Sequence, residues 1–447
     1  MTRVAVSRLP VDPGPAGWNE VLRAAEPAQT LEGNTIADCV VIGAGFAGLA
    51  AARRLSQLCP TARVAVLEAR RVAEGPAGRN SGFMIDLPHD LSSSDYGGAL
   101  SGDIEQTADN RHAISFAADM ARDFGLGADV FNRCGKINAA ATDKGDRHNR
   151  DYAAHLASMG EHSELLDAVQ MREITGTAYY QSGLYTAGTA IIQPAAFVRG
   201  VAQGIRSNRV QLFENSPVTG LQRHGSDWRV TTKSGTVKTP KVILAVNGHL
   251  NSFGFKNNRL MHVFTYASMT RPLTSEERKR LGGRDVWGVT PADPMGTTVR
   301  RIMTPQGNRI VVRNRFTFDP TMEVSAHRIE AVGRDHDRAF RARFPMLGDV
   351  QMEYRWGGRL CLSRNNVNVV QELEPGLFSA CCQNGLGTVR GTLSGILAAE
   401  LSTGVLSERL DRALAADEPE RLPHPMIAKI GANAVLKMQE FKAGKEL

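Results

Sequence analysis

The sequence has few of the features that mark a secreted, metal-binding or membrane-spanning protein. Its 447 residues include six cysteines and no C-x-x-C pair, so neither a disulfide framework nor a zinc site is expected. No apolar run reaches the about 18 residues of a membrane-spanning helix, and the N-terminal segment lacks the apolar stretch of a secretory signal. We therefore expect no transmembrane segment, no bound metal and a cytoplasmic location.

Basic residues are in modest excess and are dispersed along the chain. Lys and Arg number 53 against 46 Asp and Glu, yet no long basic run and no interleaving of basic and aromatic residues is present. Nucleic acid is therefore not an expected partner. Hydrophobic residues make up 42% of the chain, which is enough for a buried core, and the length suits two or three domains.

A strand, a glycine turn and a helix can be recognised near the N-terminus. Residues 38–42 form a short β-branched run that leads into Gly43-Ala44-Gly45-Phe46-Ala47-Gly48, and residues 49–58 carry apolar side chains at helical spacing. A second apolar run, 63–67, ends at Glu68, 20 residues after the last glycine of the turn. This combination predicts a dinucleotide-binding site, and the motif alone does not distinguish FAD from NAD.

Each glycine of the motif has a physical role. Gly43 permits the tight turn, Gly45 leaves room for a pyrophosphate, and Gly48 lets helix and strand pack closely. Free N–H groups at the helix start favour the phosphate charge. Glu68 is placed to accept hydrogen bonds from the ribose hydroxyls, which predicts an unphosphorylated ribose.

A glycine-rich loop, residues 70–82, follows the second strand at a point where a nicotinamide enzyme would usually begin a crossover helix. Together with the N-terminal lead-in and the C-terminal run Asn384-Gly385-Leu386-Gly387-Thr388, this loop resembles the FAD-dependent amine and amino-acid oxidases of the D-amino-acid oxidase, glycine oxidase and sarcosine oxidase superfamily. Within it, the pattern is most similar to γ-glutamylputrescine oxidoreductase-like enzymes. The resemblance covers most of residues 36–405 and implies FAD as the cofactor.

The resemblance implies an α/β (α+β) fold with two domains and two terminal segments. A Rossmann-like FAD-binding domain is expected over residues 36–103, 187–256 and 346–410. A substrate domain built on a mixed or antiparallel β-sheet is expected over residues 104–186, which read as mainly helical to about residue 176, and 257–345. Residues 1–35 form a lead-in and residues 411–447 a C-terminal tail or helix.

The same resemblance assigns a set of residues to FAD, distributed over the two glycine-rich loops and the strand ends between them. They are Gly43, Gly45, Phe46, Ala47, Gly48, Glu68, Ala69, Arg70, Arg79, Asn80, Ser81, Gly82, Val218, Ala245, Asn247, Gly248, Gly358, Arg359, Asn384, Gly385, Leu386, Gly387 and Thr388. The position of a sarcosine-oxidase-type flavin-linking cysteine is Gly358, and Cys361 is three residues further on, so non-covalent FAD is expected.

Amino-acid-oxidising members hold the substrate carboxylate with a basic pair, and those places here read Ile85-Asp86 and Val389. This loss argues against a simple amino-acid substrate of the sarcosine type, and Asp86 with Asp90 could instead face a cationic amine. A substrate with a carboxylate is still an alternative, because three other cations could bind it: Arg313, Arg315 and Arg390.

Residues 310–318 alternate in polarity, which predicts a strand that covers the flavin with one face. The candidate substrate-binding residues are Met84, Asp86, Arg313 and Trp356. If a catalytic base exists, His262 and Tyr266 are the candidates.

The expected activity is oxidation of a C–N bond in an amine or N-substituted amino acid by hydride transfer to flavin. The imine then hydrolyses, and oxygen reoxidises the flavin. The alternatives are a dehydrogenase that passes electrons to a quinone or carrier, and a catalytically silent FAD-binding subunit. A monooxygenase would need a nicotinamide-nucleotide site, and residues 385–391 lack the following strand and acid of such a site. A small amine and an electron acceptor are the expected partners, and a homo-oligomer is left open.

Overall fold

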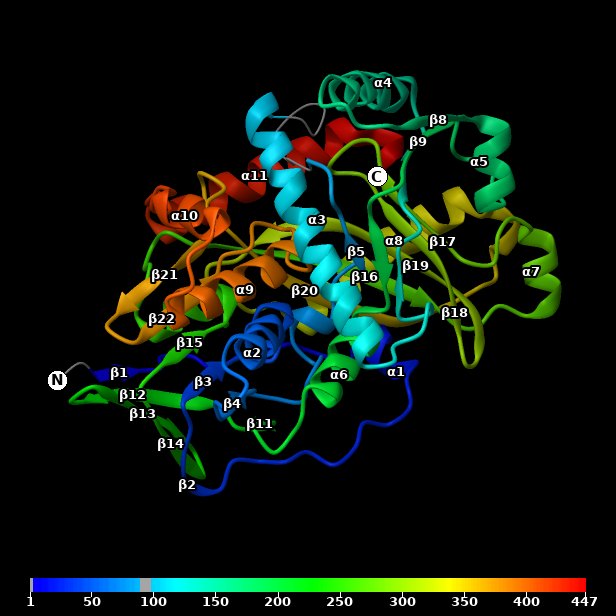
Figure 1. The fold of residues 1–447 in the computed structure, drawn as a ribbon. Helices are drawn as coiled ribbons and strands as arrows, with labels where there is room; N and C mark the ends of the chain where they lie inside the picture. The colour runs from blue at the N-terminus through cyan, green and yellow to red at the C-terminus, as the bar shows by residue number, and fades with distance from the viewer. Residues whose placement is uncertain (1–2, 89–97) are drawn as a thin grey trace.

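The computed structural model describes residues 3–88 and 98–447. Within these ranges, the chain forms four β-sheets, and the helices pack mainly on the two largest of them (Figure 1). A six-stranded sheet in the order β11-β4-β3-β15-β22-β21 carries the predicted dinucleotide-binding strands, and only β21 runs antiparallel to its neighbour. Its strands are β3 (Cys39–Ile42), β4 (Val64–Leu67), β11 (Val210–Phe213), β15 (Val242–Leu244), β21 (Val369–Glu374) and β22 (Leu377–Cys381).

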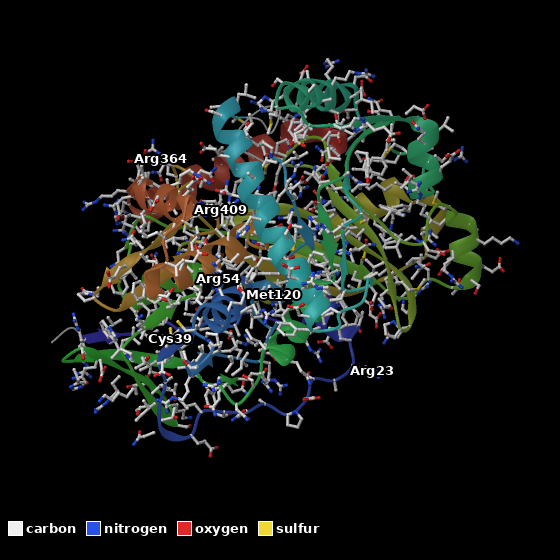
Figure 2. The ribbon with its side chains drawn as sticks, in the orientation of Figure 1. Arg23, Cys39, Arg54, Met120, Arg364 and Arg409 are labelled. Atoms are coloured by element: carbon white, nitrogen blue, oxygen red, sulfur yellow. The ribbon has the colours of Figure 1, made fainter. Side chains whose placement is uncertain are left out.

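Helices cover one face of this sheet. The layer consists of α2 (Phe46–Leu58), α3 (Leu100–Asp123), α6 (Pro194–Gly204), α9 (Val389–Thr403) and α10 (Glu408–Ala415). α2 and α9 approach closely because small residues line their contact: a Cβ on Gly395 would lie 2.1 Å from the Ala47 carbonyl oxygen. Arg54 of α2, labelled in Figure 2, adds an ion pair to Glu400 of α9 at 2.7 Å.

A five-stranded sheet, β1-β12-β13-β14-β2, covers the opposite face. Its strands are β1 (Arg3–Ala5), β2 (Gly33–Ile36), β12 (Val218–His224), β13 (Asp227–Thr232) and β14 (Gly235–Thr239). Trp228 and Val230 pack here against Val40 and Ile42 of β3. Because both faces are covered, every residue of β3 and β4 is buried, as expected of a parallel sheet.

The second large sheet has eight strands in the order β20-β16-β19-β18-β17-β7-β9-β8, and β17 with β7 is its only parallel pair among the described residues. The strands are β7 (Lys136–Ala140), β8 (Glu164–Asp167), β9 (Ser182–Thr186), β16 (Met261–Thr270), β17 (Trp287–Pro291), β18 (Thr298–Thr304), β19 (Gly307–Phe318) and β20 (Met352–Leu362). The helices that pack around it are α4 (Asp143–Ser158), α5 (Ala168–Thr175), α7 (Ser275–Leu281), α8 (Ala326–Arg343) and α11 (Pro425–Ala443).

A small sheet, β5 (Phe83–Met84), β10 (Ala190–Ile192) and β6 (Phe131–Asn132), lies at the junction of the two large sheets. Arg300 of β18 donates to the carbonyl oxygens of Ser81 at 3.0 Å and Ile192 at 2.7 Å. Burial lowers the pKa of this guanidinium to about 10, so the group stays charged at neutral pH. It therefore ties the glycine-rich loop to the eight-stranded sheet.

The expected α/β (α+β) architecture, with a Rossmann-like sheet and a second mixed sheet, is confirmed. Two elements cross the predicted domain limits: β20 pairs with β16 in the eight-stranded sheet, and α3 packs on α9. The division into domains stays a prediction. The C-terminal segment contains the helix α11, which packs on β19. None of the described helices combines the length and the apolar character needed to cross a membrane.

Candidate active site

The glycine turn between β3 and α2 is built as the motif predicted. Gly43 has φ +103°, and a Cβ there would lie 2.6 Å from the Ala245 carbonyl oxygen. A Cβ on Gly48 would lie 1.8 Å from the Gly43 carbonyl oxygen. By contrast, a Cβ on Gly45 would meet only the Ala77 Cβ, at 3.4 Å, which is an ordinary contact. The fold itself therefore requires Gly43 and Gly48, whereas Gly45 keeps open the space beside it.

That space is a cavity of about 270 Å³ that extends from the glycine turn to the eight-stranded sheet. Nineteen of the 23 residues assigned to FAD line it. They are Gly43, Gly45, Phe46, Ala47, Glu68, Ala69, Arg70, Asn80, Ser81, Val218, Ala245, Asn247, Gly248, Arg359, Asn384, Gly385, Leu386, Gly387 and Thr388. The fold thus gathers segments that are more than 300 residues apart in sequence around one cavity.

Two helix N-termini open onto the cavity. At the start of α2, the N–H groups of Gly45, Phe46 and Ala47 have no hydrogen-bond partner among the described residues. The same is true, within the described part of the chain, of the N–H groups of residues 385–388, which precede α9. Unpaired N–H groups and the helix dipole both favour negative charge, so the cavity can hold an anionic or electron-rich group beside each of these two helix N-termini.

Glu68 stands at the end of β4, beside the glycine turn. Its carboxylate accepts hydrogen bonds from the N–H of Ala44 at 2.8 Å and of Arg70 at 3.2 Å. Burial raises the pKa of this carboxyl group above its ordinary value, and the surrounding amides act in the opposite direction. Its location in the cavity wall is the one expected of a ribose-binding acid.

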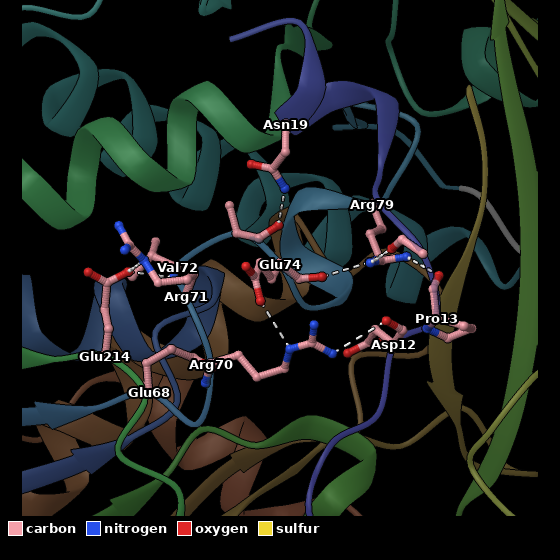
Figure 3. A network of polar contacts seen from close by, with 12 residues as sticks. Asp12, Pro13, Asn19, Glu68, Arg70, Arg71, Val72, Glu74, Arg79 and Glu214 are labelled. Atoms are coloured by element: carbon pink, nitrogen blue, oxygen red, sulfur yellow. Dashed lines mark hydrogen bonds and ion pairs between the residues drawn. The ribbon is translucent and has the colours of Figure 1, made fainter. Parts of the chain in front are cut away.

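Four residues assigned to FAD lie behind the cavity wall instead of in it: Gly48, Arg79, Gly82 and Gly358. Figure 3 shows how Arg79 is used. Its guanidinium donates to the carbonyl oxygens of Glu74 at 2.6 Å, Gly14 at 2.6 Å and Pro13 at 3.2 Å. Arg70, which does line the cavity, also reaches this region and donates to Glu74 and to the Asp12 carbonyl oxygen. Arg79 therefore anchors the N-terminal lead-in to the loop after β4.

The glycines among these four have structural reasons of their own. Gly82 has φ +80°, and a Cβ there would lie 2.4 Å from the Ile192 carbonyl oxygen. A Cβ on Gly358 would lie 3.2 Å from the Arg79 carbonyl oxygen. Both positions are tight because backbone segments cross there.

At the far end, the wall is formed by three neighbouring strands of the eight-stranded sheet. Thr298 of β18 pairs with Arg313 of β19, and Thr290 of β17 pairs with Asn138 of β7. Thr290, Thr298 and Arg313 all line the cavity. Arg313 is the cation of this wall among the described residues, and its guanidinium lies over the Phe316 ring, 5.3 Å from the centroid.

The regular alternation predicted for residues 310–318 is wrong at one point. Arg313 and Phe316 belong to opposite series of that alternation, yet both line the cavity. Arg315 between them has φ +61°, and the register with β16 shifts between Thr265 and Tyr266. This β-bulge adds a residue to the strand and turns Phe316 to the side of Arg313.

Asp86 does not line the cavity. Its carboxylate is fully buried, receives two hydrogen bonds from Arg111 at 3.0 and 3.1 Å, and accepts one from Thr189 at 3.1 Å. It is therefore neutralised inside the protein instead of facing an amine. Asp90 lies outside the described residues.

Met84 and Trp356 are fully buried in the core and do not contribute to the cavity wall. The Trp356 indole donates to the Arg79 carbonyl oxygen at 3.1 Å. Of the other cations considered for a carboxylate, Arg315 pairs with Asp335 and Glu440. Arg390 donates to the side chains of Asn366 and Gln106.

Neither candidate base reaches the cavity. His262 lies behind Gly248, where a Cβ would be 2.9 Å from its Nδ1, and burial lowers the pKa of this imidazole to about 3. The Tyr266 hydroxyl is paired with the Thr317 hydroxyl, and burial raises its pKa. The geometry gives no support to a proton-transfer role for either residue.

Several wall residues were not anticipated from the sequence. Arg8 and Asp12 come from the lead-in, which carries no recognisable motif, and His249 follows Gly248 directly. Thr290 and Thr298 lie on β17 and β18, two strands for which no prediction was made. The alternating pattern of β19 was the one available signal for this wall.

Comparison with known proteins identifies the family. The DAO family, described as FAD dependent oxidoreductase, matches residues 38–401. The chain is 24% identical over 415 residues to the probable oxidoreductase OrdL of Rhizobium meliloti (strain 1021), covering 89% of this chain and 90% of that protein. It is 26% identical over 402 residues to γ-glutamylputrescine oxidoreductase of Escherichia coli (strain K12), covering 86% and 88%.

Solved structures agree on the fold. Glycine oxidase from Geobacillus kaustophilus superposes with a TM-score of 0.68 at 16% identity, covering 84% of this chain and 96% of that one. L-proline dehydrogenase from P. horikoshii gives 0.66 at 16% identity, covering 86% and 97%. The cavity fits FAD, since Gly45 preserves space beside unpaired N–H groups and the Glu68 carboxylate lines the same cavity. The chain belongs to the DAO family of FAD-dependent oxidoreductases, with FAD as its cofactor.

Proposed function

We propose that this protein oxidises the C–N bond of an amine that carries a carboxylate, such as an N-substituted amino acid. One observation carries the proposal: a single cavity joins the glycine turn and two helix N-termini to a sheet wall whose cation is Arg313. The relatives named γ-glutamylputrescine oxidoreductase and glycine oxidase support it, because both of the compounds in these names contain an amine nitrogen.

FAD, when bound, supplies the acceptor for a hydride from the carbon next to the substrate nitrogen. The N–H groups of Gly45, Phe46 and Ala47 would hold its pyrophosphate, and Glu68 would accept hydrogen bonds from its ribose. Residues 385–388 and the start of α9 lie at another part of the wall, where they stabilise negative charge that develops during the reaction. The chain thereby fixes the reacting groups in position and excludes water between them.

The sheet wall at the substrate end of the cavity offers a binding group for a carboxylate. Arg313 can bind a carboxylate through charge-assisted hydrogen bonds. In the described residues of the eight-stranded sheet, no carboxylate or imidazole side chain lines the cavity. We therefore propose that the substrate nitrogen loses its proton to solvent and enters the reaction as a neutral amine, and that the imine product hydrolyses in water.

We further propose that FAD is held without a covalent link. Cys361 lines the cavity, but its thiol is fully buried. A hydrogen bond with Cys382 and burial raise the pKa of this thiol well above its ordinary value. A thiolate is the form that attacks, and it is disfavoured here.

The proposal is tested by anaerobic mixing of the flavoprotein with matched pairs of compounds: an N-methyl amino acid and its methyl ester, and a γ-glutamyl amine and its methyl ester. We expect the free acid of one pair to bleach the oxidised-flavin absorption band and its ester to do so much more slowly. Admission of air should restore the band and form peroxide, which is the result expected if oxygen is the acceptor. Bleaching by acid and ester at equal rates would contradict the carboxylate requirement. Slow recovery in air would favour a quinone or a carrier as acceptor, and bleaching by NADPH would favour a monooxygenase.

A further inference from the structure

Lys136 is a buried cation just behind the substrate end of the cavity. It belongs to β7, its side chain is 2% exposed, and its ammonium group donates to the side-chain oxygen of Asn138. Burial lowers the pKa of this group to about 8, against the effect of the Asp86 charge, so it is mainly protonated at neutral pH. Burial of a cation is costly unless it is hydrogen-bonded, so this contact strongly favours one arrangement of its partner.

That arrangement fixes the Asn138 amide. An ammonium group has donors and no acceptor, so the atom of Asn138 that faces it must be the oxygen. The same oxygen lies 2.7 Å from the hydroxyl of Thr290. The second neighbour of that hydroxyl, the Ile137 carbonyl oxygen at 3.4 Å, is also an acceptor. The Thr290 hydroxyl must therefore donate its hydrogen toward β7, which leaves its oxygen able to accept, and Thr290 is one of the residues that line the cavity.

The two sides of the cavity wall consequently differ in hydrogen-bonding character. Arg313 on β19 offers only donors, whereas Thr290 on β17 is left as an acceptor, and β18 lies between them. An anionic group would bind beside Arg313, and an N–H group would bind beside Thr290.

We propose that Thr290 accepts a hydrogen bond from the N–H of the substrate, and that Lys136, acting through Asn138, is the positioning residue that keeps the Thr290 hydroxyl in this orientation. The inference rests on the proposed function and adds the group that recognises the nitrogen. It explains why a lysine that does not itself line the cavity is buried beside Asn138.

The test uses two ligands of the same shape that differ at one atom. Pyrrole-2-carboxylate carries an N–H donor, whereas 2-furoate carries an acceptor oxygen in its place. Dissociation constants are measured on the FAD-loaded protein from the change in flavin absorption. The ring N–H of pyrrole-2-carboxylate can donate to the Thr290 hydroxyl oxygen, whereas the ring oxygen of 2-furoate would face it as a second acceptor. The dissociation constant of the wild type should therefore be about tenfold lower for pyrrole-2-carboxylate.

Variants of Thr290 distinguish the loss of its hydrogen-bond acceptor from a general change in packing. Thr290→Val should reduce the preference to about one while 2-furoate still binds, and Thr290→Ser should keep it. Thr107→Val is the matched control, because Thr107 is also a buried threonine, and its hydroxyl donates to the Asp103 carbonyl oxygen within α3. This control should bind both ligands like the wild type. A full preference in Thr290→Val would overturn the proposal.

The positioning role of Lys136 is tested by the ligand preference of variants at Lys136 and Asn138. In Lys136→Met, the Asn138 amide is free to turn its nitrogen toward Thr290, so the preference should fall to one or reverse in favour of 2-furoate. Asn138→Asp keeps an acceptor for both neighbours and should retain the preference, whereas Asn138→Leu should lose it. An unchanged preference in Lys136→Met and Asn138→Leu would refute the role of Lys136.

The measurements distinguish a wrong substrate class from a wrong role for Thr290. If neither ligand perturbs the flavin and no carboxylate compound bleaches it, the proposed substrate class is wrong and this inference falls with it. If carboxylate amines do bleach the flavin but the wild type binds both ring ligands equally, the proposed function stands and the role of Thr290 is refuted.

Discussion

Replacing Gly45 and Gly48 by alanine, one at a time, should separate cofactor binding from folding. At Gly45, φ is −85° and the new Cβ would meet only Ala77, at 3.4 Å, so the apoprotein should lose no more than about 1 kcal/mol of unfolding free energy. The methyl group would project into the cavity beside the unpaired N–H groups of α2. Loss of one close phosphate contact should weaken FAD binding by about tenfold to a hundredfold.

At Gly48 the expectation is reversed. The new Cβ would lie 1.8 Å from the Gly43 carbonyl oxygen, so β3 and α2 must move apart by more than an ångström. Such overpacking should cost about 1–3 kcal/mol or more of unfolding free energy. The assay is a pair of measurements on each apoprotein: thermal unfolding by circular dichroism, and FAD titration followed by flavin fluorescence. If Gly45→Ala binds FAD within twofold of the wild type and is fully folded, the pyrophosphate does not lie at this turn.

Three further outcomes are expected. Arg313→Met should raise the KM for a carboxylate substrate by about tenfold to a hundredfold at unchanged FAD affinity, and an unchanged KM would exclude Arg313 from carboxylate binding. Burial lowers the pKa of the His336 imidazole to about 3. Below about pH 6.5 this imidazole takes up a proton in the unfolded chain but not in the folded protein. The free energy of unfolding should therefore fall as the pH drops from 6.5 toward 3. His336→Asn should remove about 1.4 kcal/mol per pH unit of that slope in urea unfolding, and an unchanged slope would mean that this imidazole is protonated in the folded state. Arg111→Met leaves the Asp86 carboxylate buried without its ion pair and should cost about 3 kcal/mol, part of which the Asp86→Asn, Arg111→Met double variant should recover; no recovery would assign the loss to packing.

The dinucleotide-binding half of the site could be predicted because its signals are local. Each signal occupies only a few consecutive residues: the turn from Gly43 to Gly48, the acid Glu68 at the end of the next strand, and the glycine loop before α9. At Gly43 and Gly48 the close approach of neighbouring backbone dictates the residue type. The strands β3 and β4 are entirely buried, so their apolar runs were conspicuous.

The substrate half depends on contacts between distant segments. Thr290 meets Asn138 only because β17 pairs with β7, which is about 150 residues earlier in the chain, and no local pattern encodes that register. β7 itself lies in a region predicted to be mainly helical, since its buried Lys136 and Asn138 do not read as core residues. The bulge at Arg315 likewise moved Phe316 to a face that strict alternation had excluded.

Arg79 and Asp86 were misplaced for a related reason. Arg79 lies in the glycine-rich loop that carries the family resemblance, and Asp86 lies four residues after that loop. Their partners come from elsewhere: the lead-in carbonyl oxygens for Arg79 and Arg111 of α3 for Asp86. A buried charge takes the partner that the fold brings to it, and the sequence around the charge does not reveal that partner.

The absorption spectrum of the purified protein, recorded without oxygen before and after addition of an N-methyl amino acid or a γ-glutamyl amine, tests the central claim most directly. The account predicts an oxidised-flavin spectrum that one of these compounds bleaches, with the flavin released to the supernatant by acid precipitation. A colourless protein that fails to take up FAD would contradict the cofactor assignment, and a flavin that none of these compounds bleaches would contradict C–N oxidation.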